Sequence, residues 1–408
     1  MTASAALEGG PVARVERTYP ALDGLRAVAA LAVLVHHASY WSGDHSDDVL
    51  GRTFSRLDVG VAVFFVLSGF LLSRPLFQAA AEGRPAPRTA AYLWRRALRI
   101  LPAYWLTIAA ALLLLPRNEG VGPDTWIRHL TFTQYYGDGW FGDGLSHAWS
   151  LATEVAFYLV LPFVGAGLVA LSRRSPGRPV RALVALGAAT LGSLAWTAWT
   201  WTSRPTIGAT DLWLPAYAGW FAAGLALALL TVSSPSWGPV RVAHELGRSL
   251  PTCWAAAGAL FWIASSQIAG PIDLAAPTPG QAVLRKALYL AVGLLLVLPL
   301  VFGNQRDGVT RRVLAGPAAR FLGEISYALF LVHLVVIAGG YALFDVAPFS
   351  GSLFLVLVPT LVVSLVVAVA VYWLVERPLR RWRGLVADPA SSTSKRASSA
   401  ASATSTSV

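Results

Sequence analysis

Residues 22–37 read Leu-Asp-Gly-Leu-Arg-Ala-Val-Ala-Ala-Leu-Ala-Val-Leu-Val-His-His, and this stretch decides the fold. It opens an apolar run, yet Arg26 stands near its start and His37 at its end. In a helix, eleven positions make three turns plus about 20°, so both side chains lie on one face, roughly 16 Å apart along the axis. Ionisable groups at membrane depth usually face a bundle interior or a water-filled path, so the stretch predicts a transmembrane helix with a functional face. The alternatives are that Arg26 only anchors the helix at the cytoplasmic surface and that His37 is a polar packing residue.

The composition indicates an integral membrane protein. Of the 408 residues, 55% are hydrophobic and 13% are charged, which is too apolar for a soluble domain. The net charge of +11 comes from short basic clusters between apolar runs. That distribution argues against nucleic acid as a partner and favours a lipid bilayer. Cys253 is the only cysteine, which excludes an intrachain disulfide and a multi-cysteine metal site, and no metal is expected.

Ten runs with little charge are candidate membrane spans. They lie at roughly 23–43, 58–77, 99–116, 147–172, 182–202, 212–232, 252–268, 284–303, 321–345 and 353–375. With a cytoplasmic N-terminus, 25 of the 32 Lys and Arg residues fall on the cytoplasmic side. We therefore predict an all-α, multi-pass protein of the cell membrane with about ten transmembrane helices and both termini cytoplasmic. The transmembrane domain is expected over 19–383, between a disordered N-terminal segment, 1–18, and a disordered tail rich in Ala, Ser and Thr, 384–408.

The second and third spans carry candidate donor-binding residues. Ser68 and Gly69 either line a substrate path or let two helices approach closely. Arg96 and Arg99 are three positions apart at the start of the third span, with Arg95 beside them. Their guanidinium groups can point the same way, and a fork of arginines suits phosphate groups. The alternative is that these arginines only set the topology, because every segment predicted to be cytoplasmic is basic.

The fourth span carries a polar face at its outer end. His147, Glu154 and Tyr158 fall near one side of the helix, with Ser150 about 60° away. A carboxylate inside an apolar segment needs a partner or a function, and we favour a function for Glu154. Trp149 points the other way if the helix already includes it. The preceding loop, 117–146, either binds a polar or sugar-like acceptor or anchors the chain at the interface.

The ninth span adds a second intramembrane histidine. Ser326 and His333 are seven positions apart and share a helix face. Packing is the simpler interpretation of His333.

Six motifs in this order resemble the acyltransferase 3 family of integral membrane acyltransferases. They are Leu-Asp-Gly-Leu-Arg with a histidine after ten further residues, Phe-Phe-Val-Leu-Ser-Gly-Phe, Arg-Arg-x-x-Arg-Ile-x-Pro, Trp-Ser-Leu-x-x-Glu, Ile-Ser-Tyr-x-Leu-Phe-Leu-x-His and Val-Glu-Arg-Pro. The resemblance spans most of residues 19–383. It implies ten membrane helices and transfer of an acyl group, often acetyl, from acyl-coenzyme A to a hydroxyl group. Acceptors in the family include surface polysaccharides, membrane-linked sugars and macrolide-type metabolites.

The sequence departs from the family pattern in two places. Family members often carry an acidic residue just before the Phe-Phe of the second helix, where this chain has Ala62 and Val63, and Asp58 stands about one turn earlier. Some members also carry an extracytoplasmic hydrolase-like domain after the helices, for which this chain ends too soon. The expectation is that this polypeptide completes the transfer or passes the group to a separate extracytoplasmic partner.

With the resemblance, the residues predict a site for donor and acceptor. Acyl-coenzyme A, expected to be acetyl-coenzyme A, enters from the cytoplasm. His37 acts as general base on the acceptor hydroxyl, because neutral imidazole suits that proton transfer, and Glu154 orients the histidine or balances its charge. The donor is expected to contact Arg26, Arg95, Arg96, Arg99, Ser68 and Gly69. The acceptor is expected to be a carbohydrate or a glycosylated or macrolide-type metabolite. It is expected to contact Trp149, Ser150, Tyr158, His147 and His333. The alternative function is a transporter or flippase for a sugar- or lipid-linked substrate, in which intramembrane charges line a permeation path.

Overall fold

The computed structural model describes residues 19–44, 48–137, 141–175, 177–204, 209–272, 275–304 and 308–386, and throughout these ranges the regular structure is helical. The all-α prediction is therefore confirmed. The predictions for residues 1–18 and for the tail from 387 onward lie outside the described residues. Within those ranges, the helices long and apolar enough to cross a membrane are α1 (Ala21–Ser42), α3 (Gly60–Ala81), α4 (Thr89–Leu114), α6 (Trp149–Arg173), α7 (Val180–Ser203), α8 (Leu214–Thr231), α11 (Pro279–Phe302), α13 (Pro317–Leu343) and α14 (Leu353–Val371).

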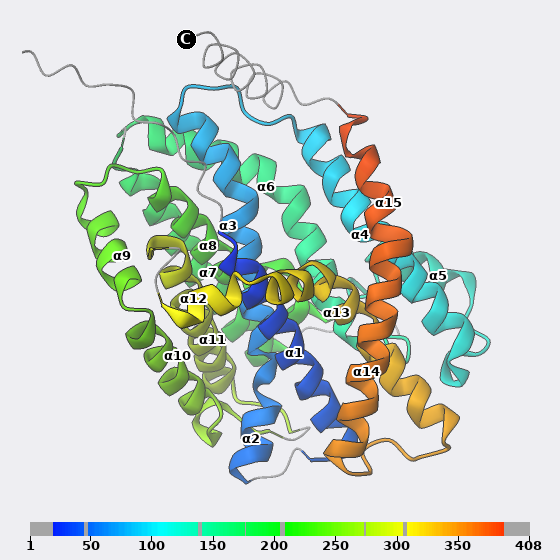
Figure 1. Cartoon of the computed structure of the whole chain (residues 1–408). Helices are drawn as coiled ribbons and strands as arrows, with labels where there is room; N and C mark the ends of the chain where they lie inside the picture. The colour runs from blue at the N-terminus through cyan, green and yellow to red at the C-terminus, as the bar shows by residue number, and fades with distance from the viewer. Residues whose placement is uncertain are drawn as a thin grey trace, which may run out of the picture.

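The seventh predicted span is shorter than expected. It folds as α10 (Leu250–Ala264), whose 15 residues are about 22 Å long, against roughly 30 Å for the hydrocarbon core of a bilayer. The helix α9 (Gly238–Arg248) precedes α10 directly, and the two follow one another along one flank of the bundle (Figure 1). Nine of the ten predicted spans are thus long enough to cross alone. The cytoplasmic placement of both termini requires that α10 crosses as well, and it stays a prediction.

Two helix pairs in the bundle bring their backbones especially close together. α3 packs against α8, and a Cβ added at Gly69 or Gly224 would come within 2.3 Å of Phe221 O or 2.1 Å of Val66 O, respectively. α1 packs against α13, and a Cβ added at Gly323 would lie 2.1 Å from Asp23 O. Small residues let helix backbones approach closely where no hydrophobic effect drives association. α1 also contacts α3, so it lies between α3 and the α13–α14 pair, in the centre of Figure 1.

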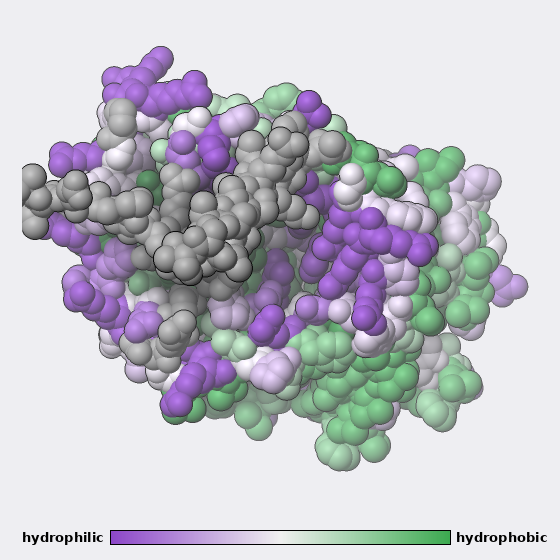
Figure 2. Space-filling model, turned by 45° about the horizontal axis from the view of Figure 1, so that its top comes forward, coloured by the Kyte–Doolittle hydropathy of each residue, from purple (hydrophilic) through white to green (hydrophobic). Residues whose placement is uncertain are grey.

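Polar ends and an apolar flank distinguish the surfaces of the bundle. The turn between α3 and α4 lies at the same end of the molecule as α15 (Arg377–Leu379), opposite the short helix α2 (Val49–Ser55) (Figure 1). Seen obliquely from that end, hydrophilic side chains gather on the left and in the middle, and hydrophobic ones cover the flank at the lower right (Figure 2). This distribution fits a protein that spans a bilayer with the flank in contact with lipid.

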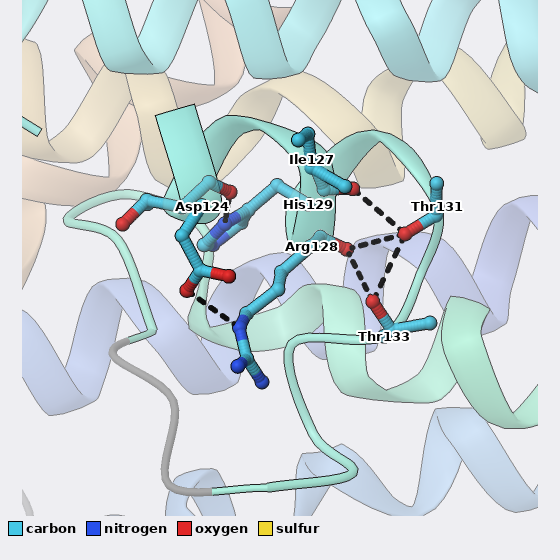
Figure 3. A network of polar contacts seen from close by, with 7 residues as sticks. Asp124, Ile127, Arg128, His129, Thr131 and Thr133 are labelled. Carbon is cyan, nitrogen blue, oxygen red and sulfur yellow. Dashed lines mark hydrogen bonds and ion pairs between the residues drawn. The ribbon is translucent and has the colours of Figure 1, made fainter. Parts of the chain in front are cut away.

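The loop after α4 contains the short helix α5 (Pro123–Leu130), which packs beside the bundle. The Tyr104 hydroxyl donates to the carbonyl oxygen of His129 at 2.7 Å. Within the loop, Arg128 pairs with Asp124 at 2.7 Å, and Thr131 bonds Thr133 at 2.9 Å (Figure 3). Residues 123–133 are therefore held against α4 and by contacts among themselves.

Candidate active site

Two histidines from distant parts of the chain meet inside the bundle. His37 on α1 and His333 on α13 are 296 positions apart, yet Nδ1 of His37 lies 3.0 Å from Nε2 of His333. The close α1–α13 packing brings the two rings together, with centroids 5.0 Å apart. His333 is 1% exposed, whereas His37 is partly exposed. Of the pair, His37 is the member that a substrate can reach.

The backbone partners of this pair assign the protons on both rings. Nδ1 of His333 lies 2.6 Å from Phe330 O, and a carbonyl oxygen can only accept, so Nδ1 carries the proton and Nε2 has a lone pair. That lone pair accepts from Nδ1–H of His37, which also faces Val33 O at 3.0 Å. In its neutral form His37 therefore keeps a lone pair on Nε2, as a general base requires.

His147 adds a third imidazole. Its ring centroid is 5.0 Å from that of His333 and 6.3 Å from that of His37. Nε2 of His147 donates to Leu331 O at 3.1 Å, which leaves Nδ1 as a buried acceptor without a hydrogen-bond partner in the described part of the chain. A hydroxyl group is the kind of donor such an atom needs. In the same part of the chain, no group of three or more His, Cys, Asp and Glu side chains is arranged to hold a metal ion.

A second set of predicted residues gathers nearer the predicted cytoplasmic end. Arg26 on α1 lies close enough to Arg99, Tyr158 and Glu154 for their charges to act on it. Its ion pair is with Asp23, one turn earlier, at 3.6 Å. Arg96 is likewise close to Tyr158, Arg99 and Glu154. Three helices, α1, α4 and α6, therefore contribute to one cluster of charged side chains, called here the arginine cluster.

The arginine cluster has spare hydrogen-bonding capacity. Nε of Arg96 is buried and has no acceptor among the described residues. Arg383, beyond α14, lies close to Arg99, Arg96 and Glu376. Arginines here outnumber carboxylates, and an unpaired guanidinium N–H in such a place suits an anionic ligand such as phosphate. The structure brings Arg96 and Arg99 together as predicted, while Arg95 is not among the charges acting on Arg26, Arg96 or Arg383.

Glu154 belongs to the arginine cluster rather than to the histidine cluster. Its carboxylate accepts a hydrogen bond from the Ser68 hydroxyl on α3, and the Tyr158 ring lies beside it. His37 receives its orienting contact from His333 instead. The structure thus separates Glu154 from the role of orienting His37 and joins it to Ser68 and the arginines.

The remaining predicted residues divide between packing and the outer end. Gly69 sits against the backbone of α8, the packing role that the sequence left open. The Ser150 hydroxyl bonds to the carbonyl oxygen of His147 at 3.1 Å, at the start of α6. Trp149, the first residue of α6, stacks on Tyr217 with centroids 4.8 Å apart.

Sequence reasoning missed Glu376 as a site residue. It ends a π-helical turn, Tyr372–Glu376, that follows α14, and it is 7% exposed with Oε1 lacking a hydrogen-bond partner among the residues described. Among the opposite charges that act on it, those of Arg99 and Arg380 act most strongly. π-turns within helices are frequent at functional sites. The available signal was the Val-Glu-Arg-Pro motif, which places a carboxylate at the end of an apolar span.

Comparison with known proteins adds a family and its activity. The family model described as an acyltransferase domain matches residues 19–373. Nodulation protein 10 of Rhizobium leguminosarum bv. viciae is 26% identical over 348 residues, which cover 77% of this chain and 82% of that protein. The putative peptidoglycan O-acetyltransferase YrhL of Bacillus subtilis (strain 168) is 29% identical over 195 residues, and the peptidoglycan O-acetyltransferase OatA of Listeria monocytogenes is 27% identical over 165 residues. These alignments cover 44% and 36% of this chain but 28% and 24% of those relatives. No solved structure matches the chain.

Proposed function

The chain belongs to the acyltransferase domain family and is a multi-pass membrane O-acyltransferase, and from this premise we propose that it transfers an acetyl group from acetyl-coenzyme A to a hydroxyl group of a carbohydrate. The observation that carries the proposal is the His37–His333 pair, which leaves a base nitrogen on His37. The names of the O-acetyltransferase relatives support acetyl as the group transferred.

The arginine cluster supports coenzyme A as the donor. Arg96 and Arg99 hold the phosphates through charge-assisted hydrogen bonds, and the buried Nε of Arg96 supplies an N–H without an acceptor. Arg26 lies on the same helix as His37, about 16 Å nearer the cytoplasmic end, which is of the order of the length of a pantetheine arm. The donor thus supplies an activated acyl group, a thioester, to the histidine cluster.

The reaction step uses the lone pair of His37. Nε2 of His37 takes the proton of the acceptor hydroxyl while the hydroxyl oxygen attacks the thioester carbonyl carbon. The carbon–sulfur bond breaks, and the proton moves from His37 to the departing thiolate, so the enzyme returns to its starting state. Nδ1 of His147, an acceptor without a partner within the described ranges, accepts from a second hydroxyl group of the carbohydrate and so orients the acceptor. His333 acts as a positioning residue because it fixes the proton of His37 on Nδ1.

Direct assay with a labelled donor tests this function. Purified protein in lipid nanodiscs is given acetyl-coenzyme A labelled in the acetyl group together with soluble glycosides, and ester formation is followed with release of free coenzyme A. We expect one ester formed for each coenzyme A released, and no ester when acetyl phosphate replaces the donor. Ester formation that does not require coenzyme A contradicts the proposal. In sealed proteoliposomes, movement of glycoside across the bilayer without esterification also contradicts it and is the result that a transporter or flippase gives.

A further inference from the structure

Lys286 is a partly exposed residue with a buried ammonium nitrogen, and the proposed reaction does not use it. It lies seven residues after the start of α11, in the outer half of the predicted bundle. Its ammonium nitrogen is 3.0 Å from the centroid of the Tyr217 ring and 5.2 Å from that of Trp220. This nitrogen is buried and has no hydrogen-bond acceptor among the described residues. Removing a charge from water is costly unless a partner compensates, and aromatic faces compensate for only part of that cost.

The nearby carboxylates do not meet this need. Asp211 and Asp58 act on Lys286 from a distance, as does the like charge of Arg285. Asp58 instead accepts a hydrogen bond from the Tyr289 hydroxyl. Arg56 binds backbone carbonyls, including Gly270 O at 2.7 Å, and keeps its charge. The three cations of this cluster exceed its two carboxylates, which leaves it with a positive charge.

Helix dipoles reinforce that charge. α3, α6, α8 and α11 all run from the outer end inward in the predicted topology, so their N-termini point to the side of the membrane on which this cluster lies. The N-terminus of a helix carries about half a positive charge and attracts anions. Tyr217 and Trp149 lie in the first turn of α8 and of α6, and Lys286 lies about two turns inside α11.

An aromatic wall connects this cluster to the histidines. Trp149 stacks on Tyr217, and Phe65 meets both rings edge-on, at 6.4 and 5.7 Å between centroids. Trp149 follows His147 by two residues and is itself partly exposed. Aromatic faces beside a charge are suited to a ligand with an apolar ring face and a polar, charged edge.

We propose that Lys286, Tyr217 and Trp149 form a subsite for an anionic sugar, one that carries a carboxylate or a phosphate next to the ring whose hydroxyl is acetylated. The subsite rests on the proposed function, because it places that ring against the aromatic wall that leads to His147 and His37. The anionic group meets the ammonium of Lys286, and this supplies the hydrogen-bond acceptor that the folded chain does not provide. The enzyme therefore selects charged over neutral acceptors.

The experiment measures binding of matched sugars to the full chain in nanodiscs by calorimetry. Methyl β-glucuronoside and glucose 6-phosphate are compared with methyl β-glucoside, which lacks the anionic group. We expect at least one of the charged sugars to bind at least tenfold more tightly than the glucoside, and the stronger of the two identifies the anionic group. Equal affinities in the wild-type protein overturn the proposal whatever the variants do.

Three variants locate the preference. Lys286→Met should abolish the tenfold ratio while affinity for the glucoside changes less than twofold. Lys286→Arg should retain the ratio in part, and Arg117→Met, which removes an exposed cation from the loop after α4, should leave it intact. A preference that survives in Lys286→Met overturns the subsite. Acetyl-coenzyme A turnover is measured in the same preparations, so loss of transfer with the binding ratio intact counts against the proposed reaction and not against the subsite.

Discussion

At the scale of single residues, the account depends on which atoms hold protons. His333 donates to Phe330 O and accepts from His37, so its contribution is to hold the His37 proton on Nδ1 and leave Nε2 free. A residue that acts through another in this way should affect turnover more than donor binding.

We predict that His333→Ala lowers kcat roughly 10- to 100-fold, a loss of about 1.4–2.7 kcal/mol in transition-state stabilisation. KM for acetyl-coenzyme A should stay within twofold of the wild-type value, because the substitution leaves the arginine cluster unchanged. His333→Gln should recover part of kcat, since its amide oxygen can accept the same proton. Steady-state kinetics checks this, and equal kcat for the alanine and wild-type proteins would show that the pair has no positioning role.

The cytoplasmic arginines yield a prediction about geometry rather than charge. Replacing Arg96 and Arg99 together by lysine keeps both charges but removes the planar fork that binds phosphate in a bidentate way. We expect the apparent KM for acetyl-coenzyme A to rise roughly ten- to a hundredfold, in keeping with a loss of about 1–3 kcal/mol. Acceptor KM should change little.

Arg173 and Arg174 supply the matched control. Both are exposed at the end of α6, and their double lysine variant should behave like the wild-type protein. If the two double variants have the same kinetics, the arginines of α4 set topology only.

At the scale of elements, α5 depends on a buried histidine. Burial lowers the pKa of His129 below its usual 6.5, and His129 is 1% exposed with Nδ1 bonded to Thr125 O at 2.8 Å. The released loop therefore binds more protons than the docked loop between the lowered pKa and 6.5. Docking is fully stable above pH 6.5 and weakens as pH falls below it, by up to about 1.4 kcal/mol per pH unit.

We predict that hydrogen-exchange protection of residues 123–134, corrected for intrinsic rates, falls between pH 7 and pH 5.5. His129→Gln should remove this pH dependence, because glutamine does not titrate. The range stays well above pH 4, since burial raises the pKa of Asp143 in the same loop and its titration has the opposite sign. The same pH response in both proteins would refute the role of His129.

The elements also show what a sequence can predict. Nine of the ten predicted spans correspond, within the described residues, to helices long and apolar enough to cross a membrane, because in a bilayer each helix satisfies its own backbone hydrogen bonds. The shared face of Arg26 and His37 followed from helix geometry alone. The contact between His37 and His333 did not, because it depends on how α1 packs on α13. The packing interpretation of His333 missed its use as a hydrogen-bond acceptor for the same reason.

Other site features escaped prediction because they depend on packing between helices. The π-turn that buries Glu376 has no apolar periodicity of its own. Lys286 falls on the outer side of the predicted topology, and only the approach of α8 to α11 shows that its ammonium lies on Tyr217. Asp58 stands about one turn before the position of the family's acidic residue, and it accepts a hydrogen bond from Tyr289 on α11.

At the scale of the whole molecule, α10 decides the topology. If it crosses, ten spans place both termini in the cytoplasm, as the basic residues predict. Single cysteines at Ser236 and Ala276, both exposed, would flank α9 and α10 in a protein in which Cys253 is replaced by serine. We predict that an impermeant thiol reagent labels intact cells at 276 and not at 236. Labelling at both or neither would mean that α10 does not cross.

The central claim is that His37 is the general base of a coenzyme A-dependent acetyl transfer, and a single-turnover experiment tests it most directly. His37→Gln and, as a control, His244→Gln on the distant helix α9 are loaded with labelled acetyl-coenzyme A, and the rate of ester formation is measured beside the Kd of the donor. We predict that His37→Gln slows transfer roughly 10²- to 10⁴-fold, the usual contribution of general base catalysis, with donor Kd unchanged within twofold. His244→Gln should transfer at the wild-type rate. Transfer by His37→Gln at the wild-type rate, with the donor bound normally, would contradict the account.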